Sequence, residues 1–111
     1  MRRLRELWNG RLSLADAFWS WLVVKGLVVN LMCTFVALGI LAVDTDRDAA
    51  GERAVTLLGA FAVVAHLAAV PFNLICVVGV WRSSAAATRP SWLAPAARAA
   101  ALATFVAYLV I

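Results

Sequence analysis

Apolar residues along the chain gather in three long blocks, which two short polar segments separate. The blocks predict membrane-spanning helices over residues 14–43, 54–81 and 92–111. A bilayer core about 30 Å thick needs about 20 helical residues to cross it. The first two blocks exceed that length and the third barely reaches it, so we expect the C-terminus at or within the far interface. The pattern therefore predicts an all-α membrane protein with three transmembrane helices.

A short basic segment, residues 1–13, precedes the first block. Leu4, Leu7 and Trp8 share one helical face and the arginines lie on the other, which is the pattern of a short amphipathic helix at a membrane surface. A basic tail that only sets the topology would show the same composition, and both interpretations stay open. The apolar run that follows is far longer than the hydrophobic part of a signal peptide, so we expect the first helix to stay uncleaved.

Charged residues in the connecting segments predict the orientation. Residues 44–53 contain four acids and two arginines and form the predicted acidic loop on the outer side of the membrane. Residues 82–91 form a basic cytoplasmic loop. Because arginines concentrate on the cytoplasmic side of membrane proteins, we expect a multi-pass membrane protein with its N-terminus in the cytoplasm. The arginines expected to set this topology and to contact lipid headgroups are Arg2, Arg3, Arg5, Arg11, Arg82 and Arg89.

The composition favours the lipid bilayer as the main partner. The 111 residues are 65% hydrophobic and 14% charged, whereas soluble domains are about half apolar and a quarter charged. The net charge of +4 lies in segments that flank the apolar blocks, which favours lipid headgroups over nucleic acid. Cys33 and Cys76 lie in different apolar blocks, outside any Cys-x-x-Cys pair and away from histidine. Free thiols are therefore expected, with neither a disulfide nor a metal site.

Polar residues inside the predicted helices form a candidate intramembrane cluster: Lys25, Asn30, His66 and Asn73. A helical rise of about 1.5 Å per residue puts Lys25 and Asn73 at one depth, with Asn30 and His66 deeper. Antiparallel helices would then place Lys25 beside Asn73, and Asn30 nearer His66. Polar groups in lipid need a partner or a role. They either bond the helices together or line a proton path, an ion path or a ligand pocket.

Small residues mark the candidate helix-packing positions. Ala99, Ala103 and Ala107 recur every four residues on the third helix, and Gly26 precedes Asn30 by one turn on the first. Small residues let helices approach closely in lipid. We therefore expect the third helix to have a tight neighbour, which is one of the other two helices, a second copy or a larger complex.

Two local expectations concern Asp16. Ser13, three residues earlier, predicts a helix start at which the serine hydroxyl accepts the backbone N–H of Asp16. Arg98 lies about 9 Å into the third helix, so we expect it to reach the interface or to pair with Asp16.

Two stretches of the sequence carry a resemblance to a known group. Residues 8–31 contain Trp-x-Gly-x-x-x-Leu, then Phe-Trp and a Gly-x-x-x-Asn step, and residues 71–84 contain Pro-Phe-Asn followed by Gly-x-Trp-Arg-Ser. Together they resemble short bacterial inner-membrane proteins to which no activity is assigned. The resemblance implies the same topology in the bacterial inner membrane, where residues 44–53 form an acidic periplasmic loop, and it implies no chemistry. The matching positions are Trp8, Gly10, Leu14, Phe18, Trp19, Gly26, Asn30, Pro71, Phe72, Asn73, Gly79, Trp81, Arg82 and Ser83.

The sequence contains no pattern typical of a catalytic site, because no Ser-His-Asp set, Cys-His pair or phosphate-binding loop is visible. We therefore expect no enzyme activity and no cofactor. The leading hypothesis is a non-catalytic accessory or packing subunit of a larger membrane complex, with a protein partner as well as lipid. The alternative is a homo-oligomeric transporter or channel for ions or small solutes, with a polar path near His66.

Overall fold

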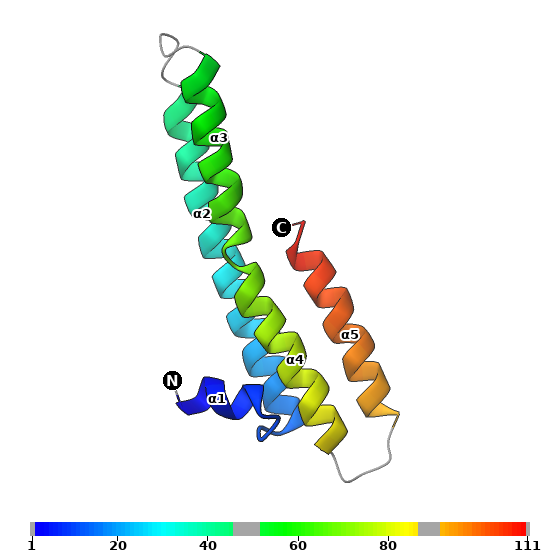
Figure 1. The fold of residues 1–111 in the computed structure, drawn as a ribbon. Coiled ribbons are helices and arrows are strands. Elements are labelled where there is room, and N and C mark those ends of the chain that lie inside the picture. The colour runs from blue at the N-terminus through cyan, green and yellow to red at the C-terminus, as the bar shows by residue number, and fades with distance from the viewer. Residues whose placement is uncertain (1, 46–51, 87–91, 111) are drawn as a thin grey trace.

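The computed structural model describes residues 2–45, 52–86 and 92–110 (Figure 1). Within these ranges the chain forms helices and no strand. The molecule is elongated, with extents of 63 × 27 × 18 Å. The helices are α1 (Arg2–Trp8), the π-helix η1 (Asp16–Lys25), α2 (Gly26–Thr45), α3 (Glu52–Leu67), α4 (Val70–Ala86) and α5 (Leu93–Tyr108).

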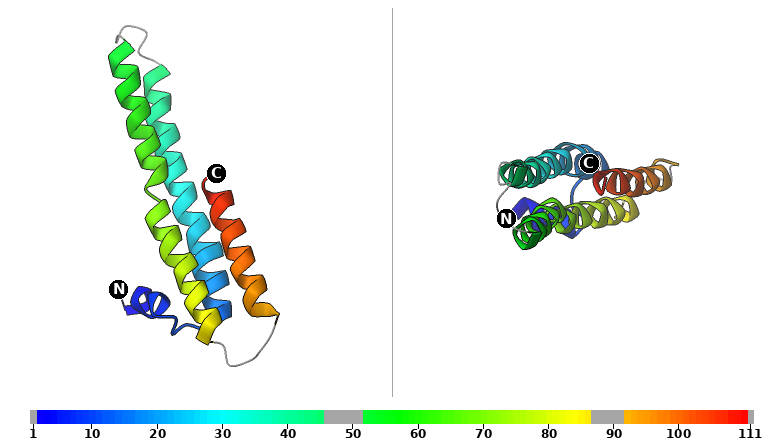
Figure 2. Two further views of the ribbon diagram at one scale, coloured as in Figure 1. Left: turned by 45° about the vertical axis from the view of Figure 1, so that its right-hand side comes forward. Right: turned by 90° about the horizontal axis from the view of Figure 1, so that it is seen from above.

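Two long antiparallel rods form the body of the fold. The first rod is η1 followed directly by α2, and the second is α3 followed by α4 (Figure 1). α1 crosses the rods near one end, which also holds the start of η1, the end of α4 and the start of α5. We call this the proximal end and the opposite one the distal end. α5 lies along the proximal half only, beside α4 and η1 (Figure 2).

The apolar side chains of the rods mostly face outward. Two helical runs, Asp16–Ala42 and Leu57–Ala86, are long and apolar enough to cross a membrane. Only 17% and 22% of the residues in their most apolar windows are buried inside the structure. Phe35, for example, is 69% exposed. The shorter α5, with 16 residues, is about 24 Å long at the α-helical rise.

The first rod begins as the sequence predicts, because the Asp16 backbone N–H donates to Ser13 Oγ at 3.1 Å. The ten residues of η1 then form a π-helix, which the apolar pattern does not predict. At its end the Gly26 N–H donates to the Trp21 carbonyl, five residues back. π-Helical turns are uncommon and often lie at functional positions. Three consecutive carbonyls of η1, those of residues 21–23, accept hydrogen bonds from side chains of α4 and α5.

The second rod breaks where Pro71 predicts a defect. Ala68 and Ala69 form a turn between α3 and α4, because proline has no N–H to donate to the carbonyl one turn earlier and its ring crowds that turn. The rod then continues to Ala86, so the prediction of a loop from residue 82 is wrong for residues 82–86. The rest of that loop, residues 87–91, lies outside the described residues, as do residues 46–51 of the acidic segment.

Packing explains why α4 continues past Trp81. Ser83 and Ser84 are both buried, and the Ser84 hydroxyl donates to the Trp81 carbonyl at 2.7 Å. Arg98 of α5 also donates to Ser84 Oγ at 2.7 Å, so a neighbouring helix packs over this turn, although the polar character of the serines alone indicates a loop.

Candidate functional site

A reciprocal amide pair joins the two rods near the level where α5 ends. The Asn30 side-chain N–H donates to Asn73 Oδ1 at 3.1 Å, and the Asn73 side-chain N–H donates to Asn30 Oδ1 at 3.2 Å. Asn30 also donates to the Gly26 carbonyl at 2.7 Å. Both side chains are almost fully buried, at 3% and 1% exposure. The pair therefore satisfies its own polar groups in an apolar surrounding.

His66 lies further toward the distal end and contacts Thr34 rather than Asn30. Its Nδ1 is 3.3 Å from Thr34 Oγ1. The expectations that Asn30 would lie nearer His66, and Lys25 beside Asn73, are therefore corrected. Helical side chains lean toward the N-terminus of their own helix. In antiparallel rods Asn30 leans proximally and Asn73 distally, so they meet, whereas His66 leans away from Asn30.

Lys25 stands apart from both pairs. Its side chain is exposed, and its ammonium lies 3.5 Å from the centroid of the Trp21 ring. Trp21 is one turn nearer the proximal end, and the ring face attracts a cation. The four predicted cluster residues therefore occupy three separate places: an Asn30–Asn73 pair, a His66–Thr34 contact and a Lys25–Trp21 contact.

Gly26 is the position where α5 meets the first rod. A Cβ atom at Gly26 would lie 2.9 Å from Cε2 of Tyr108, so only glycine fits there without displacing the ring. The Tyr108 hydroxyl donates to the carbonyls of Leu22 and Val23, at 3.2 and 2.9 Å. A π-helix changes which carbonyls accept backbone N–H groups. The carbonyls of Leu22 and Val23 can therefore accept from a side chain.

Tyr108 is the contact residue that the sequence analysis missed. It is the only tyrosine of the chain and it stands at the end of an alanine-rich helix. A phenol buried in an apolar surrounding needs a hydrogen-bond partner, and this was the available signal. Cys76 makes a similar contact from α4, because its Sγ donates to the Trp21 carbonyl at 3.6 Å.

α1 is a helix docked on the proximal end of α4. Leu7 is fully buried against Gly79, where an added Cβ would lie 2.6 Å from Leu7 Cγ. Arg82 donates to the Trp8 carbonyl at 2.6 Å, and its guanidinium lies 4.7 Å from the centroid of the Trp8 ring. Gly10, with φ +69°, turns the chain closely past Arg82. Four positions of the motifs quoted above therefore meet in one contact.

The arginines differ in what they contact. Arg2 pairs with Glu6 at 3.1 Å. Arg3 pairs with Asp16 at 3.7 Å, and Arg98 instead donates to Ser84 Oγ at 2.7 Å and lies over the Trp81 ring. The expected pairing of Arg98 with Asp16 is therefore wrong, because α5 packs on α4 at this level. Arg89 lies outside the described residues.

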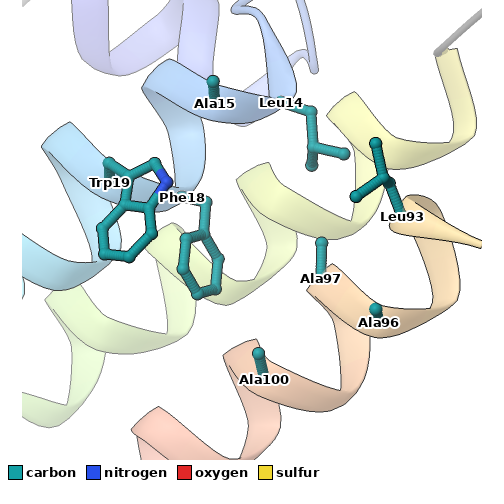
Figure 3. Close-up of a pocket in the computed structure, with 8 residues that line it drawn as sticks. All are labelled: Leu14, Ala15, Phe18, Trp19, Leu93, Ala96, Ala97 and Ala100. Atoms are coloured by element: carbon teal, nitrogen blue, oxygen red, sulfur yellow. The ribbon is translucent and has the colours of Figure 1, made fainter.

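The predicted packing alanines face away from the rods. Ala99, Ala103 and Ala107 are exposed, whereas Ala101 and Tyr108 form the buried side of α5. An apolar groove of about 470 Å³ separates α5 from η1 beside this face. Figure 3 shows the groove, with alanines on the α5 wall and aromatic rings on the η1 wall. Its lining residues are Leu14, Ala15, Phe18, Trp19, Leu93, Ala96, Ala97 and Ala100.

Within the described ranges no three His, Cys, Asp or Glu side chains are grouped to hold a metal ion. No family model, curated protein or solved structure matches this chain. The resemblance to short bacterial membrane proteins therefore stays a prediction. The described site consists of buried polar contacts between helices. Beside them lies a surface of small residues that faces outward.

Proposed function

We propose that this chain is a small integral protein of the bacterial inner membrane and a non-catalytic accessory or packing subunit of a larger membrane complex. Membrane insertion is supported by the outer surface of the two rods. Their apolar windows are mostly unburied, and side chains such as Phe35 and Phe61 are more than 60% exposed, at 69% and 64%. Lipid is the solvent that makes such a surface favourable.

The charge distribution supports the orientation. α1, which contains Arg2, Arg3 and Arg5, and the end of α4, which contains Arg82, both lie at the proximal end (Figure 1), and arginine-rich ends face the cytoplasm. In this topology the N-terminus is cytoplasmic and the acidic segment is periplasmic. α5 is the third span, and its length of about 24 Å is shorter than a hydrocarbon core of about 30 Å. It therefore ends at or within the far interface.

One observation carries the accessory role, namely that the small-residue face of α5 is turned outward. Ala99, Ala103 and Ala107 are exposed, so neither rod is the tight neighbour that such a ladder favours. Meanwhile Asn30 and Asn73 bond to each other and serve internal packing. The arrangement fits a protein that holds its own helices together with polar contacts and offers α5 to a partner helix.

Mild-detergent extraction followed by sizing and mass spectrometry tests this function. The wild-type chain should co-purify with a larger membrane complex. Ala103→Leu adds bulk to the exposed ladder, and over-packing costs about 1–3 kcal/mol, so recovery of the partner should fall at least fivefold. Ala60→Leu adds the same bulk at an exposed position of α3 and should leave recovery unchanged. Equal recovery of partner with all three chains would contradict the proposal.

The second candidate function, a homo-oligomeric transporter or channel, is favoured by one feature. His66 and Thr34 border a groove of about 470 Å³ between α2 and α3, so a polar contact is accessible from the surface of the distal half. If the extracted chain proved to be a pure homo-oligomer whose solute flux disappeared in His66→Ala with assembly intact, transport would replace the accessory role.

A further inference from the structure

One arginine of the docked helix α1 has no ion-pair partner in the described part of the chain. Arg2 and Arg3 pair with Glu6 and Asp16. Arg5 is exposed, and in the described part of the chain it forms no ion pair. The arginines expected to contact headgroups as a group are therefore not equivalent, and Arg5 has its charge available.

Arg5 lines a small groove between α1 and α4. The groove has a volume of about 270 Å³ and is lined by Leu4, Arg5, Trp8 and Ile75. Leu4 and Ile75 are partly buried against the core and supply its apolar lining, and Trp8, which is 43% exposed, is an amphipathic side chain. A guanidinium beside apolar side chains matches an amphiphile that carries an anionic group and a hydrocarbon chain.

The groove is held in shape before any ligand arrives. The Arg82 guanidinium bonds the Trp8 carbonyl and stacks on the Trp8 ring, and Leu7 is buried against Gly79. α1 therefore cannot turn its apolar side away from α4 without breaking these contacts. Preorganisation of this kind lowers the cost of ordering a site when a ligand binds.

We propose that this groove binds one anionic phospholipid, with the lipid phosphate on Arg5 and an acyl chain against Leu4 and Ile75. The proposal rests on the membrane location proposed above, which puts α1 at the headgroup level of the cytoplasmic leaflet. Charge complementarity selects an anionic lipid, and the apolar side chains of Leu4 and Ile75 select a lipid over free phosphate. Trp8 fits the same level, because tryptophan is enriched at membrane interfaces.

Native mass spectrometry of the full chain in mild detergent tests the site. Phosphatidylglycerol and phosphatidylcholine with identical acyl chains are added stepwise, and bound lipids are counted. We expect one phosphatidylglycerol to bind at least fivefold more tightly than phosphatidylcholine. Arg5→Gln should weaken phosphatidylglycerol binding about fivefold, as expected for one arginine at an anionic surface.

Arg2→Gln is the matched control, because it removes the same charge from the same helix at a position already paired with Glu6. It should change phosphatidylglycerol binding less than twofold. Equal losses in Arg5→Gln and Arg2→Gln would show general charge attraction and overturn the site. Equal binding of both lipids by the wild type, or displacement of phosphatidylglycerol by millimolar inorganic phosphate, would overturn it as well.

Carbonate extraction of native membranes separates this proposal from the proposed function. If wild type and Arg5→Gln both remain in the carbonate-washed membrane but bind phosphatidylglycerol equally, only the lipid site fails. If the wild type is washed off, the membrane location fails and the lipid site fails with it.

Discussion

At the scale of single residues, the Asn30–Asn73 pair is the contact most sensitive to change. Each amide is buried and bonds its partner in both directions, so removal of one side chain leaves the other without its partner. An unsatisfied buried polar group costs about 1–3 kcal/mol. Interhelical hydrogen bonds in membrane proteins have a coupling energy of about 0.6 kcal/mol on average and up to about 1.7.

We expect Asn30→Ala and Asn73→Ala each to lower the free energy of unfolding by about 1–2 kcal/mol. The double variant should lose less than the sum, with a coupling energy of about 0.6–1.7 kcal/mol. Titration with a denaturing detergent in mixed micelles measures all three.

Met32→Ala combined with Asn73→Ala is the control pair, because Met32 is 66% exposed, and its effect should be additive. Additive losses for the asparagine pair as well would show that the two amides do not support each other.

At the scale of elements, α1 is attached to the rods through the proximal turns of α4. Gly79 receives Leu7, and the same turns supply Arg82 to the Trp8 carbonyl. The amphipathic pattern alone left a helix at the membrane surface and a basic tail equally open, and it did not predict docking on α4. The structure shows a helix, because α4 provides both an apolar cavity for Leu7 and a donor for the end of α1.

Gly79→Ala should release α1. The added methyl group would overlap several atoms of Leu7. We therefore expect a cost in the upper part of the range of about 1–3 kcal/mol for over-packing, above the gain of about 1 kcal/mol from replacing a helical glycine. Backbone amides of residues 4–8 should then exchange with deuterium about tenfold faster.

Gly59→Ala provides the matched control, because nothing lies within 4 Å of an added Cβ there. It should leave exchange in α1 unchanged. Protection of α1 that is the same in Gly79→Ala as in the wild type would mean that the Leu7 contact does not hold the helix.

At the scale of the whole molecule, the two ends differ in both charge and packing. α1, α4 and α5 meet η1 at the proximal end, whereas among the described residues the distal half consists of α2 and α3 (Figure 2). Tyr108 anchors α5 beside Gly26, partway along the first rod. The third helix, α5, therefore packs against the proximal half of the two rods. Over the described ranges, the distal half has no such contact with α5.

Reporter fusions test the proposed topology. Alkaline phosphatase fused after Ile111 should be active and a fluorescent protein in the same place dark, because the proposed topology puts the end of α5 on the periplasmic side. The same reporters inserted after Ala86 should give the opposite result, since the proposed topology puts the end of α4 in the cytoplasm. Cytoplasmic signals from both positions would show that α5 does not cross.

The local sequence determined the helical class, the two long apolar runs, the break before Pro71 and the Ser13 start of the first rod. These features depend on hydropathy over short windows and on backbone chemistry. Both are properties of neighbouring residues in the chain and do not require knowledge of the tertiary structure. The sequence also singled out Asn30, Asn73, His66, Lys25 and Gly26 as residues with a role inside the helices. It misplaced their partners by about one helical turn.

The tertiary structure alone decided which of those residues meet. Contacts depend on the rotation of each helix about its axis and on the lean of its side chains, and one turn of offset pairs Asn30 with Asn73 instead of His66. The π-helix, the Tyr108 anchor and the outward face of Ala103 follow from the packing of α5 against η1 and α4. These features join residues far apart in the chain, and so no local pattern predicts them.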